Sequence, residues 1–294
     1  MQTGFIAVGI GLMADPEVMS LAAETAEQTG FHSIWAPEHI VLLDQYASRY
    51  PYSPDGKFPS PTMQVEILDP FAALTFIAAQ TKTIRVGTGI CLVPERNPLT
   101  TAKEVATLDK LSGGRFDFGV GVGWLEEEFT ALGVPWARRA ARTREYLQVM
   151  KKLWTEEETS FEGEFCSFPS VRSYPKPVQK PHPPIIFGGE SEPALKRVGE
   201  VGDGWFGMNV SVDEAPAKIG RIKDYARAAG RDPDALQFAI SPGLGAPLTR
   251  DDIKRAQDAG VGQLIVGLFP ADRQAVKDDI ARLAEQVVEP AASL

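Results

Sequence analysis

Three histidines are the first candidates for acid–base chemistry, because an imidazole changes its charge near neutral pH. His39 stands directly after Glu38, just past the apolar run 31–36, which predicts a buried strand. A histidine past the carboxyl end of a strand can donate a proton or orient a bound group. The alternative is a loop histidine bonded to the backbone, and position alone favours neither. We expect His32, which opens the same strand, and His182, in the run KPHPP, to be structural.

Alternating glycines end the run RFDFGVGV, which predicts a strand over 115–122. Gly119, Gly121 and Gly123 expose bare backbone, which leaves room for a flat ring or a phosphate. Close packing inside a barrel is the alternative. The pattern does not complete the dinucleotide-binding fingerprint, because no helix begins directly after it. Gly121, Val122 and Gly123 are therefore candidate binding residues.

A second glycine pair follows the predicted strand 184–187. Gly188 and Gly189 stand just before Ser191, where the sequence predicts a helix capped by that serine. Free N–H groups at a helix N-terminus bind anions, so this turn is a candidate phosphate site. Glu190 argues against an anion unless its carboxylate points away, and an ordinary capped helix start is the alternative.

Arginines gather at the start of the long helix predicted over 136–156. Arg138, Arg139 and Arg142 follow the glycine-rich strand closely and could clamp phosphate oxygens. A solvated helix face is the commoner role for such a cluster. We keep Arg142 among the candidate binding residues.

The sequence lacks the residues that several other kinds of active site require. His39 has no Cys or His partner, so no zinc site is expected. No lysine ends a strand on that face, which disfavours a Schiff-base aldolase, and no nucleophile elbow is present. Glu38 and Asp203 are the only carboxylates near strand ends, and Asp203 starts its strand, so we expect no metal.

The candidates lie in a chain that alternates short apolar runs with amphipathic ones. Strands are predicted to start near residues 3, 31, 84, 115, 184, 203, 235 and 262. Helix starts are predicted where a capping residue precedes proline or forms a capping box, at Asp15-Pro16, Asp69-Pro70, Asn97-Pro98, Ser211 with Glu214, and Thr249 with Asp252. Eight strand–helix pairs predict an α/β fold, specifically a (β/α)8 TIM barrel forming one domain over 1–294. A doubly wound open sheet is the rival.

Two insertions exceed ordinary loop lengths. The first, 37–68, follows strand two and therefore lies at the carboxyl ends of the strands, where barrel active sites sit. Its aromatic residues suggest an apolar or aromatic-lined lid: Tyr46, Tyr50, Tyr52 and Phe58. The second, 157–183, follows helix four, so we expect it on the opposite face.

Charge and composition restrict the partners. The chain has 294 residues with 30 Lys+Arg against 39 Asp+Glu, a net charge of −9. Such an acidic chain does not suit nucleic acid. Cys91 and Cys166 are too few for a disulfide framework, and no apolar run reaches the ~18 residues of a membrane span. The N-terminus lacks the basic region of a signal peptide, so we expect a cytoplasmic enzyme with a small-molecule substrate.

Several stretches together resemble one family. They are FHSIWAPEH (31–39), RVGTGICLVPERNPLTTAKEVATLDKLSGGRFDFGVGVGWLEEEF (85–129), ARTREYLQVMKKLW (141–154), FEGEF (161–165), KPHPPIIFGGES (180–191) and GDGWF (202–206). In this order they resemble the bacterial luciferase-like superfamily, and within it the F420-dependent oxidoreductases. These motifs are specific for the superfamily and much less so for cofactor and substrate.

The resemblance implies a barrel that holds FMN or the deazaflavin F420 at the carboxyl ends of its strands. His39 matches a histidine that commonly assists catalysis in F420-dependent members. A non-proline cis peptide that supports the ring in many members maps to Gly89-Ile90. Motifs and resemblance together select as cofactor-binding residues Thr88, Gly89, Ile90, Gly121, Val122, Gly123, Arg142, Gly188, Gly189 and Ser191.

Two positions depart from family patterns. F420-dependent sugar-phosphate dehydrogenases have a catalytic Glu where this chain has Trp124, so we expect Trp124 to shape the substrate wall instead. Many FMN monooxygenases have a phosphate-contacting Tyr where this chain has Ala140, which favours F420 over FMN.

Three functions remain open. The first is F420-dependent hydride transfer to or from a small organic substrate, with His39 supplying or removing the proton. The alternative is an FMN-dependent monooxygenase that receives reduced flavin from a separate reductase. A barrel that only binds, without turnover, is the third, and the intact glycine pattern and His39 disfavour it.

A homodimer is also expected, because superfamily barrels usually pair through helices near strands two and three. Candidate interface residues are Phe71, Ala72, Leu74, Phe76, Leu99, Val105 and Leu108. Packing against the barrel is the alternative use of these side chains.

Overall fold

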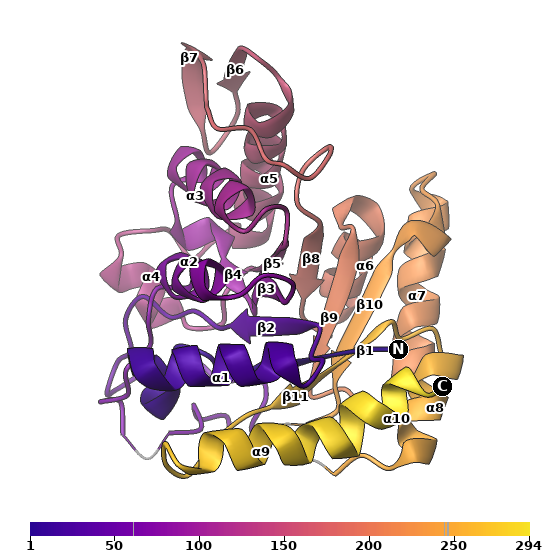
Figure 1. Cartoon of the computed structure of the whole chain (residues 1–294). Coiled ribbons are helices and arrows are strands. Elements are labelled where there is room, and N and C mark those ends of the chain that lie inside the picture. The colour runs from indigo at the N-terminus through magenta and orange to yellow at the C-terminus, as the bar shows by residue number, and fades with distance from the viewer. Residues whose placement is uncertain (61, 244, 246) are drawn as a thin grey trace.

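All neighbouring strands of the main sheet run parallel (Figure 1). The structure, a computed structural model, describes residues 1–60, 62–243, 245 and 247–294; residue 61 of the first insertion lies outside this description. The strands are β1 (Gln2–Ile6), β2 (Ser33–Ala36), β3 (Arg85–Thr88), β4 (Cys91–Leu92), β5 (Phe116–Gly121), β8 (Ile185–Gly188), β9 (Gly204–Met208), β10 (Gln237–Ser241) and β11 (Gln263–Gly267). Their order is β3-β2-β1-β11-β10-β9-β8-β5-β4, and β3 also pairs with β5, which closes the ring. The predicted TIM barrel is confirmed.

Helices surround this ring on its outer side (Figure 1). They are α1 (Pro16–Gln28), α2 (Pro70–Gln80), α3 (Pro98–Leu111), α4 (Glu126–Ala131), α5 (Arg139–Thr155), α6 (Glu192–Val201), α7 (Ala215–Ala228), α8 (Arg250–Asp258), α9 (Ala275–Leu283) and α10 (Glu289–Ala292). Asp15, Asp69 and Asn97 accept first-turn N–H groups, as predicted. Thr249 and Asp252 form the predicted capping box. Each of these caps satisfies backbone donors that a helix start would otherwise leave free.

Two predicted caps need correction. Ser191 occupies the N-cap position of α6, but its side chain makes no capping hydrogen bond. Ser211 and Glu214 do bond reciprocally, with the Glu214 N–H donating to the Ser211 hydroxyl. That bond closes the turn before α7, because the helix itself begins at Ala215.

Three predicted elements have other boundaries than expected, and one helix was not predicted. The third barrel strand is broken after Thr88 and resumes at Cys91. The long helix begins at Arg139 rather than residue 136, because Arg138 adopts a left-handed backbone conformation. The last helix is interrupted by a π-helical segment, Ala284–Val288, and continues into α10. The short helix α4 was not predicted, and it carries a residue of the candidate site.

Large side chains fill the inside of the barrel, so it is packed rather than hollow. This inner set is Ile6, Trp35, Ile186, Phe206, Ala239 and Ile265. A Cβ on Gly119 would lie 1.8 Å from the Thr88 carbonyl oxygen, and one on Gly87 would lie 2.6 Å from the Trp35 ring. Gly119 therefore allows close packing inside the barrel, which was one of the two alternatives for this residue.

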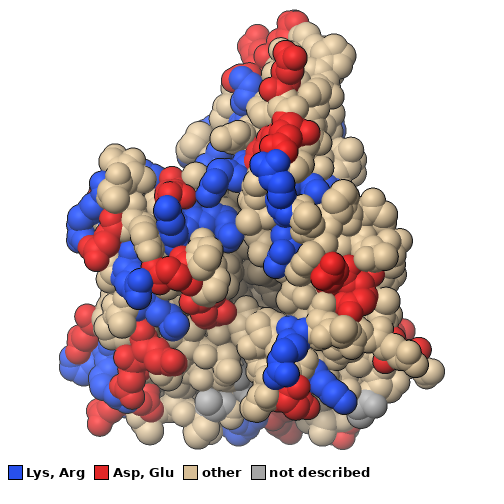
Figure 2. Space-filling model, turned by 180° about the vertical axis from the view of Figure 1, so that it is seen from behind, with Lys and Arg blue, Asp and Glu red and all other residues tan. Residues whose placement is uncertain are grey.

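The second insertion contains an antiparallel hairpin, β6 (Thr159–Glu162) and β7 (Ser167–Val171), which sequence reasoning missed. It forms the projection at the top of Figures 1 and 2. At the hairpin tip, the N–H groups of Phe165 and Cys166 donate to Glu145, in the N-terminal half of α5. The expectation that this insertion lies wholly on the opposite face was therefore wrong, because its tip reaches toward the carboxyl ends of the strands.

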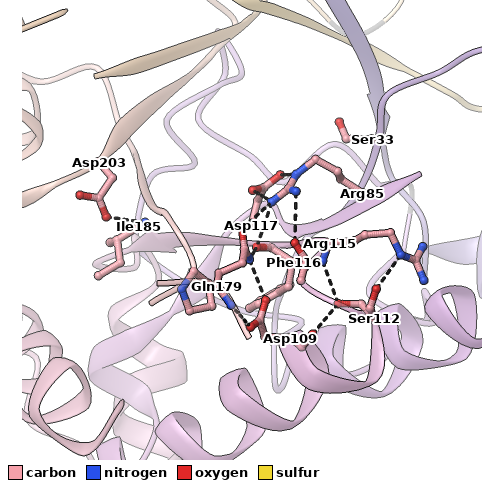
Figure 3. A network of polar contacts seen from close by, with 12 residues as sticks. Ser33, Arg85, Asp109, Ser112, Arg115, Phe116, Asp117, Gln179, Ile185 and Asp203 are labelled. Carbon is pink, nitrogen blue, oxygen red and sulfur yellow. Dashed lines mark hydrogen bonds and ion pairs between the residues drawn. The ribbon is translucent and has the colours of Figure 1, made fainter. Parts of the chain in front are cut away.

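Only the returning segment of this insertion lies at the amino ends of the strands (Figure 3). There Asp109 accepts the N–H groups of Val178 and Gln179 at 2.6 and 3.0 Å. Arg85 and Asp117, on neighbouring strands, form an ion pair beside them. These contacts fix the chain before it enters β8.

On the face seen in Figure 2, Lys and Arg are interspersed with Asp and Glu. Within the described ranges, no helix is long and apolar enough to cross a membrane. Those same ranges hold no group of three or more His, Cys, Asp or Glu side chains arranged to bind a metal ion.

Candidate active site

His39 lies in the loop after β2, at the carboxyl ends of the strands, and its side chain is 9% exposed. Its Nδ1 is 2.7 Å from Oε2 of Glu128, a residue of α4. The indole Nε1 of Trp124, just after β5, donates to His39 Nε2 at 3.3 Å. Two chain segments far apart in sequence thus hold both nitrogens of this imidazole.

Glu128 is fully buried. Its second oxygen, Oε1, accepts the N–H groups of Ile40 and Val41 at 2.6 and 3.1 Å. Sequence reasoning missed this residue. The available signal was a Glu triplet opening a short helix directly after the glycine-rich strand, but nothing in one chain showed which of the three faces His39.

Aromatic rings from the first insertion pack against His39 and Trp124. Ring centroids lie 5.1 to 5.8 Å apart between His39 and Phe58, His39 and Trp124, Tyr46 and Trp124, and Tyr50 and Trp124. The neighbouring carboxylate, Glu127, anchors the insertion by accepting the N–H groups of Ala47 and Ser48. The aromatic-lined lid expected from 37–68 is present, and it covers the predicted catalytic histidine.

Ile90 packs against the glycine wall, which is the bare backbone of Gly121 and Gly188 at the ends of β5 and β8. The peptide bond between Gly89 and Ile90 is cis, as the resemblance implied. A Cβ on Gly121 would lie 2.1 Å from Ile90 Cδ1, and one on Gly188 would lie 2.8 Å from the same atom. The Ile90 side chain therefore fills the space beside the bare backbone at the ends of β5 and β8. The alternative, in which this backbone leaves room for a flat ring or a phosphate, is wrong at these two glycines.

Thr88 has a structural bond in this wall, since its buried hydroxyl donates to the Gly119 carbonyl at 2.6 Å. Gly123 has a positive φ of +80°, and a Cβ there would lie 2.7 Å from the Phe129 ring. Val122 and Trp124 are half-buried at the same end. These residues thus lie at the carboxyl ends of β3 and β5, and Trp124 is the one that contacts His39.

The start of α6 offers two backbone donors to an anion. The Ser191 and Glu192 N–H groups have no hydrogen-bond partner among the described residues, whereas residue 193 is a proline and the Ala194 N–H donates to the Ser191 carbonyl. Gly189 turns the chain with a φ of +100°, Ser191 is exposed, and its hydroxyl does not cap the helix. The carboxylate of Glu190 points to β9, where it accepts the Met208 N–H at 2.8 Å. Burial raises the pKa of Glu190 to about 7, while a hydrogen bond from Tyr52 opposes the shift. The carboxyl therefore faces β9 and the first insertion, and its raised pKa lowers the negative charge that it brings near the start of α6 at neutral pH.

The arginines divide their roles. Arg142 is buried, donates to the Pro135 carbonyl at 2.7 Å, and lies against the Phe165 ring. Arg139 instead stacks on Trp136, with its guanidinium 3.4 Å from the ring centroid, and reaches the Gly123 carbonyl at the end of β5. The structure thus brings Arg139 to the end of this strand, whereas Arg142 supports the hairpin tip.

Comparison with known proteins gives the family. Residues 9–289 match the family described as luciferase-like monooxygenase. The chain belongs to the luciferase-like monooxygenase family. It is 36% identical over 271 residues to an uncharacterised protein of Mycobacterium tuberculosis, covering 90% of this chain and 91% of that protein.

Two further proteins that are similar to this chain use different cofactors. The chain is 30% identical to an FMNH2-dependent dimethylsulfone monooxygenase of Pseudomonas putida, over 84% of this chain and 62% of that protein. Its fold matches coenzyme F420-dependent tetrahydromethanopterin reductase from Methanopyrus kandleri with a TM-score of 0.76. That pair shares 19% identity, and the match covers 98% of each chain.

The other two histidines of this luciferase-like barrel lie at its opposite end, as expected for structural residues. His32 and His182 line a cavity of about 640 Å³ at the amino ends of the strands. Burial lowers the pKa of His32. The carboxylate candidate Glu38 has structural partners, because it forms an ion pair with Arg96 and accepts the Leu92 N–H at 2.5 Å.

Proposed function

We propose that this luciferase-like enzyme is an F420-dependent oxidoreductase that transfers hydride to or from a small organic substrate. The observation that carries the proposal is the imidazole of His39, held at both nitrogens beneath an aromatic lid at the end of the barrel where Ile90 and the glycine wall meet. A hydride transfer to or from carbon needs a proton partner near the substrate, and this histidine has the position for it.

The residues present fit a phosphate-bearing cofactor. The start of α6, with the turn at Gly188 and Gly189, would hold an anionic group through the Ser191 hydroxyl and the Ser191 and Glu192 N–H groups. Ile90, whose side chain covers Gly121, would contact the ring on its walled side together with Val122. When bound, F420 supplies a carbon that gives or accepts a hydride.

His39 supplies or removes the proton at Nε2. In the structure this atom accepts the Trp124 indole N–H, so a substrate oxygen or nitrogen would take the place of that bond. The rings of Tyr46, Tyr50 and Phe58 exclude water from the same space, which strengthens polar interactions there. The lid therefore favours a substrate with an apolar body and one polar reacting group.

The choice of F420 over FMN is supported by Ala140, where many FMN monooxygenases of the superfamily carry a phosphate-contacting tyrosine. The second candidate function is an FMN-dependent monooxygenase with a separate reductase. The 30% identity to the FMNH2-dependent Pseudomonas enzyme favours that alternative. A homodimer is part of both proposals.

Separate titrations of the purified protein with F420 and with FMN, followed by fluorescence quenching, test the choice. We expect F420 to bind at micromolar concentration or tighter, and FMN to bind much more weakly. His39→Ala is expected to bind F420 while losing turnover, and His182→Ala, at the far end of the barrel, serves as the matched control. Binding of FMN alone, with oxygen consumption when reduced flavin is supplied, would favour the monooxygenase and reject the F420 proposal.

A further inference from the structure

We propose that Glu128 is a positioning residue that fixes His39 in the tautomer with a proton on Nδ1, and so keeps Nε2 as the atom that exchanges a proton with the substrate. The catalytic consequence rests on the proposed function. The tautomer itself does not, because it follows from contacts within this chain.

The argument starts from the two partners of the imidazole. A carboxylate oxygen that faces a ring nitrogen at 2.7 Å accepts a hydrogen, so Nδ1 of His39 must carry one. The indole Nε1 of Trp124 only donates, so Nε2 must present its lone pair. Both neighbours thus require the same neutral tautomer, with the proton on Nδ1.

Glu128 itself is held in one orientation. Its Oε1 accepts two consecutive backbone N–H groups, from Ile40 and Val41, directly after the histidine. Oε2 is then left for Nδ1, and full burial keeps water from competing. One side chain on α4 therefore sets both the path of the loop after β2 and the proton position on its imidazole.

The surrounding acids do not disturb this arrangement. Glu95 interacts with Glu128, but burial and the nearby Glu128 and Glu38 raise the pKa of Glu95 to about 9, so it is uncharged at neutral pH. Glu127 points to another part of the insertion, where it holds the N–H groups of Ala47 and Ser48. Glu128 is the carboxylate that contacts His39.

Nitrogen-15 NMR of the histidine side chains in the cofactor-free protein tests the tautomer. The chain has only three histidines, and His39→Ala assigns the signal. In the wild type we expect Nδ1 in the protonated range and Nε2 in the unprotonated range once the ring is neutral. In Glu128→Gln the amide can donate to Nδ1, so the proton is expected to move to Nε2.

Matched variants separate positioning from loop structure. Glu127→Gln loosens the same insertion without touching His39, and we expect it to leave the tautomer unchanged. Trp124→Phe removes the donor to Nε2, and the proton is expected to remain on Nδ1 because Glu128 still accepts it. A tautomer that switches in Trp124→Phe, or that stays unchanged in a folded Glu128→Gln, would overturn the proposal.

Turnover then measures the consequence. With the cofactor established by the titrations, Glu128→Gln is expected to lower kcat/KM by about 10²-fold or more, the typical scale of acid–base catalysis. Glu128→Asp keeps the carboxylate and is expected to recover part of that loss with the wild-type tautomer. If no variant turns over with F420 or FMN, the function proposed above fails, whereas the NMR result still decides the role of Glu128.

Discussion

Glu95 lies beside the site at 8% exposure, and both of its carboxyl oxygens are buried with no hydrogen-bond partner among the described residues. A buried carboxyl without a partner costs least when it is protonated. Burial, Glu128 and Glu38 accordingly raise its pKa to about 9. This residue is therefore a source of pH-dependent instability next to the candidate active site.

Replacing Glu95 with glutamine is expected to stabilise the protein at alkaline pH and to change little near pH 5. The unfolded carboxyl ionises near 4.5, whereas the folded one has a pKa of about 9. Over that interval the unfolded state loses its proton first, so the wild type loses up to about 1.4 kcal/mol of stability per pH unit. Glu95→Gln removes this slope, and urea unfolding across the interval measures it. Glu285→Gln, an exposed control, should retain the wild-type slope, and equal slopes in all three proteins would contradict the prediction.

At the scale of elements, the break between β3 and β4 brings one side chain into contact with two other strands. After β3 the chain departs from the sheet at Gly89 and Ile90 and rejoins it as β4. The Ile90 side chain then lies across the ends of β5 and β8, where Gly121 and Gly188 have no Cβ. The two glycines, distant in sequence, are thus explained by a single side chain of a third strand.

Gly121→Ala tests this packing. The added methyl would lie 2.1 Å from Ile90 Cδ1, so Ile90 must shift, and overpacking of this kind costs about 1–3 kcal/mol. Ile90→Val deletes that Cδ1 atom, so the double variant is expected to recover part of the loss in urea unfolding. Gly119→Ala is the control, because its methyl would meet the Thr88 backbone oxygen, which Ile90→Val does not relieve. An additive double variant at position 121 would argue against the contact.

The barrel could be predicted from sequence because its signals are local. Asp15, Asp69 and Asn97 cap helices through atoms two or three residues away, and each apolar run carries its own strand. Ser191 shows the limit of such signals, because a capping residue type does not reveal whether its hydroxyl is used.

The pairing of the site could not be predicted in the same way. Glu128 and His39 are 89 residues apart, and their contact depends on α4, a helix too short to give a periodic signal. The resemblance gave the cis peptide correctly and selected His39 as a candidate, but it carried no information about which carboxylate faces the imidazole. Ile90 likewise occupies the space beside Gly121 only because three strand ends meet there.

At the scale of the whole molecule, the two ends of the barrel differ. The carboxyl ends carry the nearly buried imidazole and the start of α6, which has no side-chain cap. The amino ends carry the Arg85–Asp117 pair and the Asp109 contacts that hold the second insertion (Figure 3). This division matches barrel enzymes, in which one face serves chemistry and the other stability.

The expected homodimer makes a prediction at this scale. Of the seven interface candidates, Phe71, Leu74, Val105 and Leu108 are buried within the chain, so the barrel itself uses them. Ala72 is exposed, Leu99 is half-buried, and Phe76 on α2 is 39% exposed. An exposed aromatic side chain of this kind is a typical interface anchor. We therefore expect Phe76 to anchor the pairing.

Sedimentation velocity at micromolar concentration is expected to show a dimer for the wild type. Phe76→Lys buries a charge in the interface, and a typical hot-spot loss of about 2 kcal/mol would weaken dimerisation roughly 30-fold. Phe269→Lys is the control, since Phe269 is 57% exposed but follows β11, which neighbours β1 and β10 rather than β2 or β3. A monomeric wild type would reject the dimer. A dimer that both variants leave intact would instead move its interface away from α2.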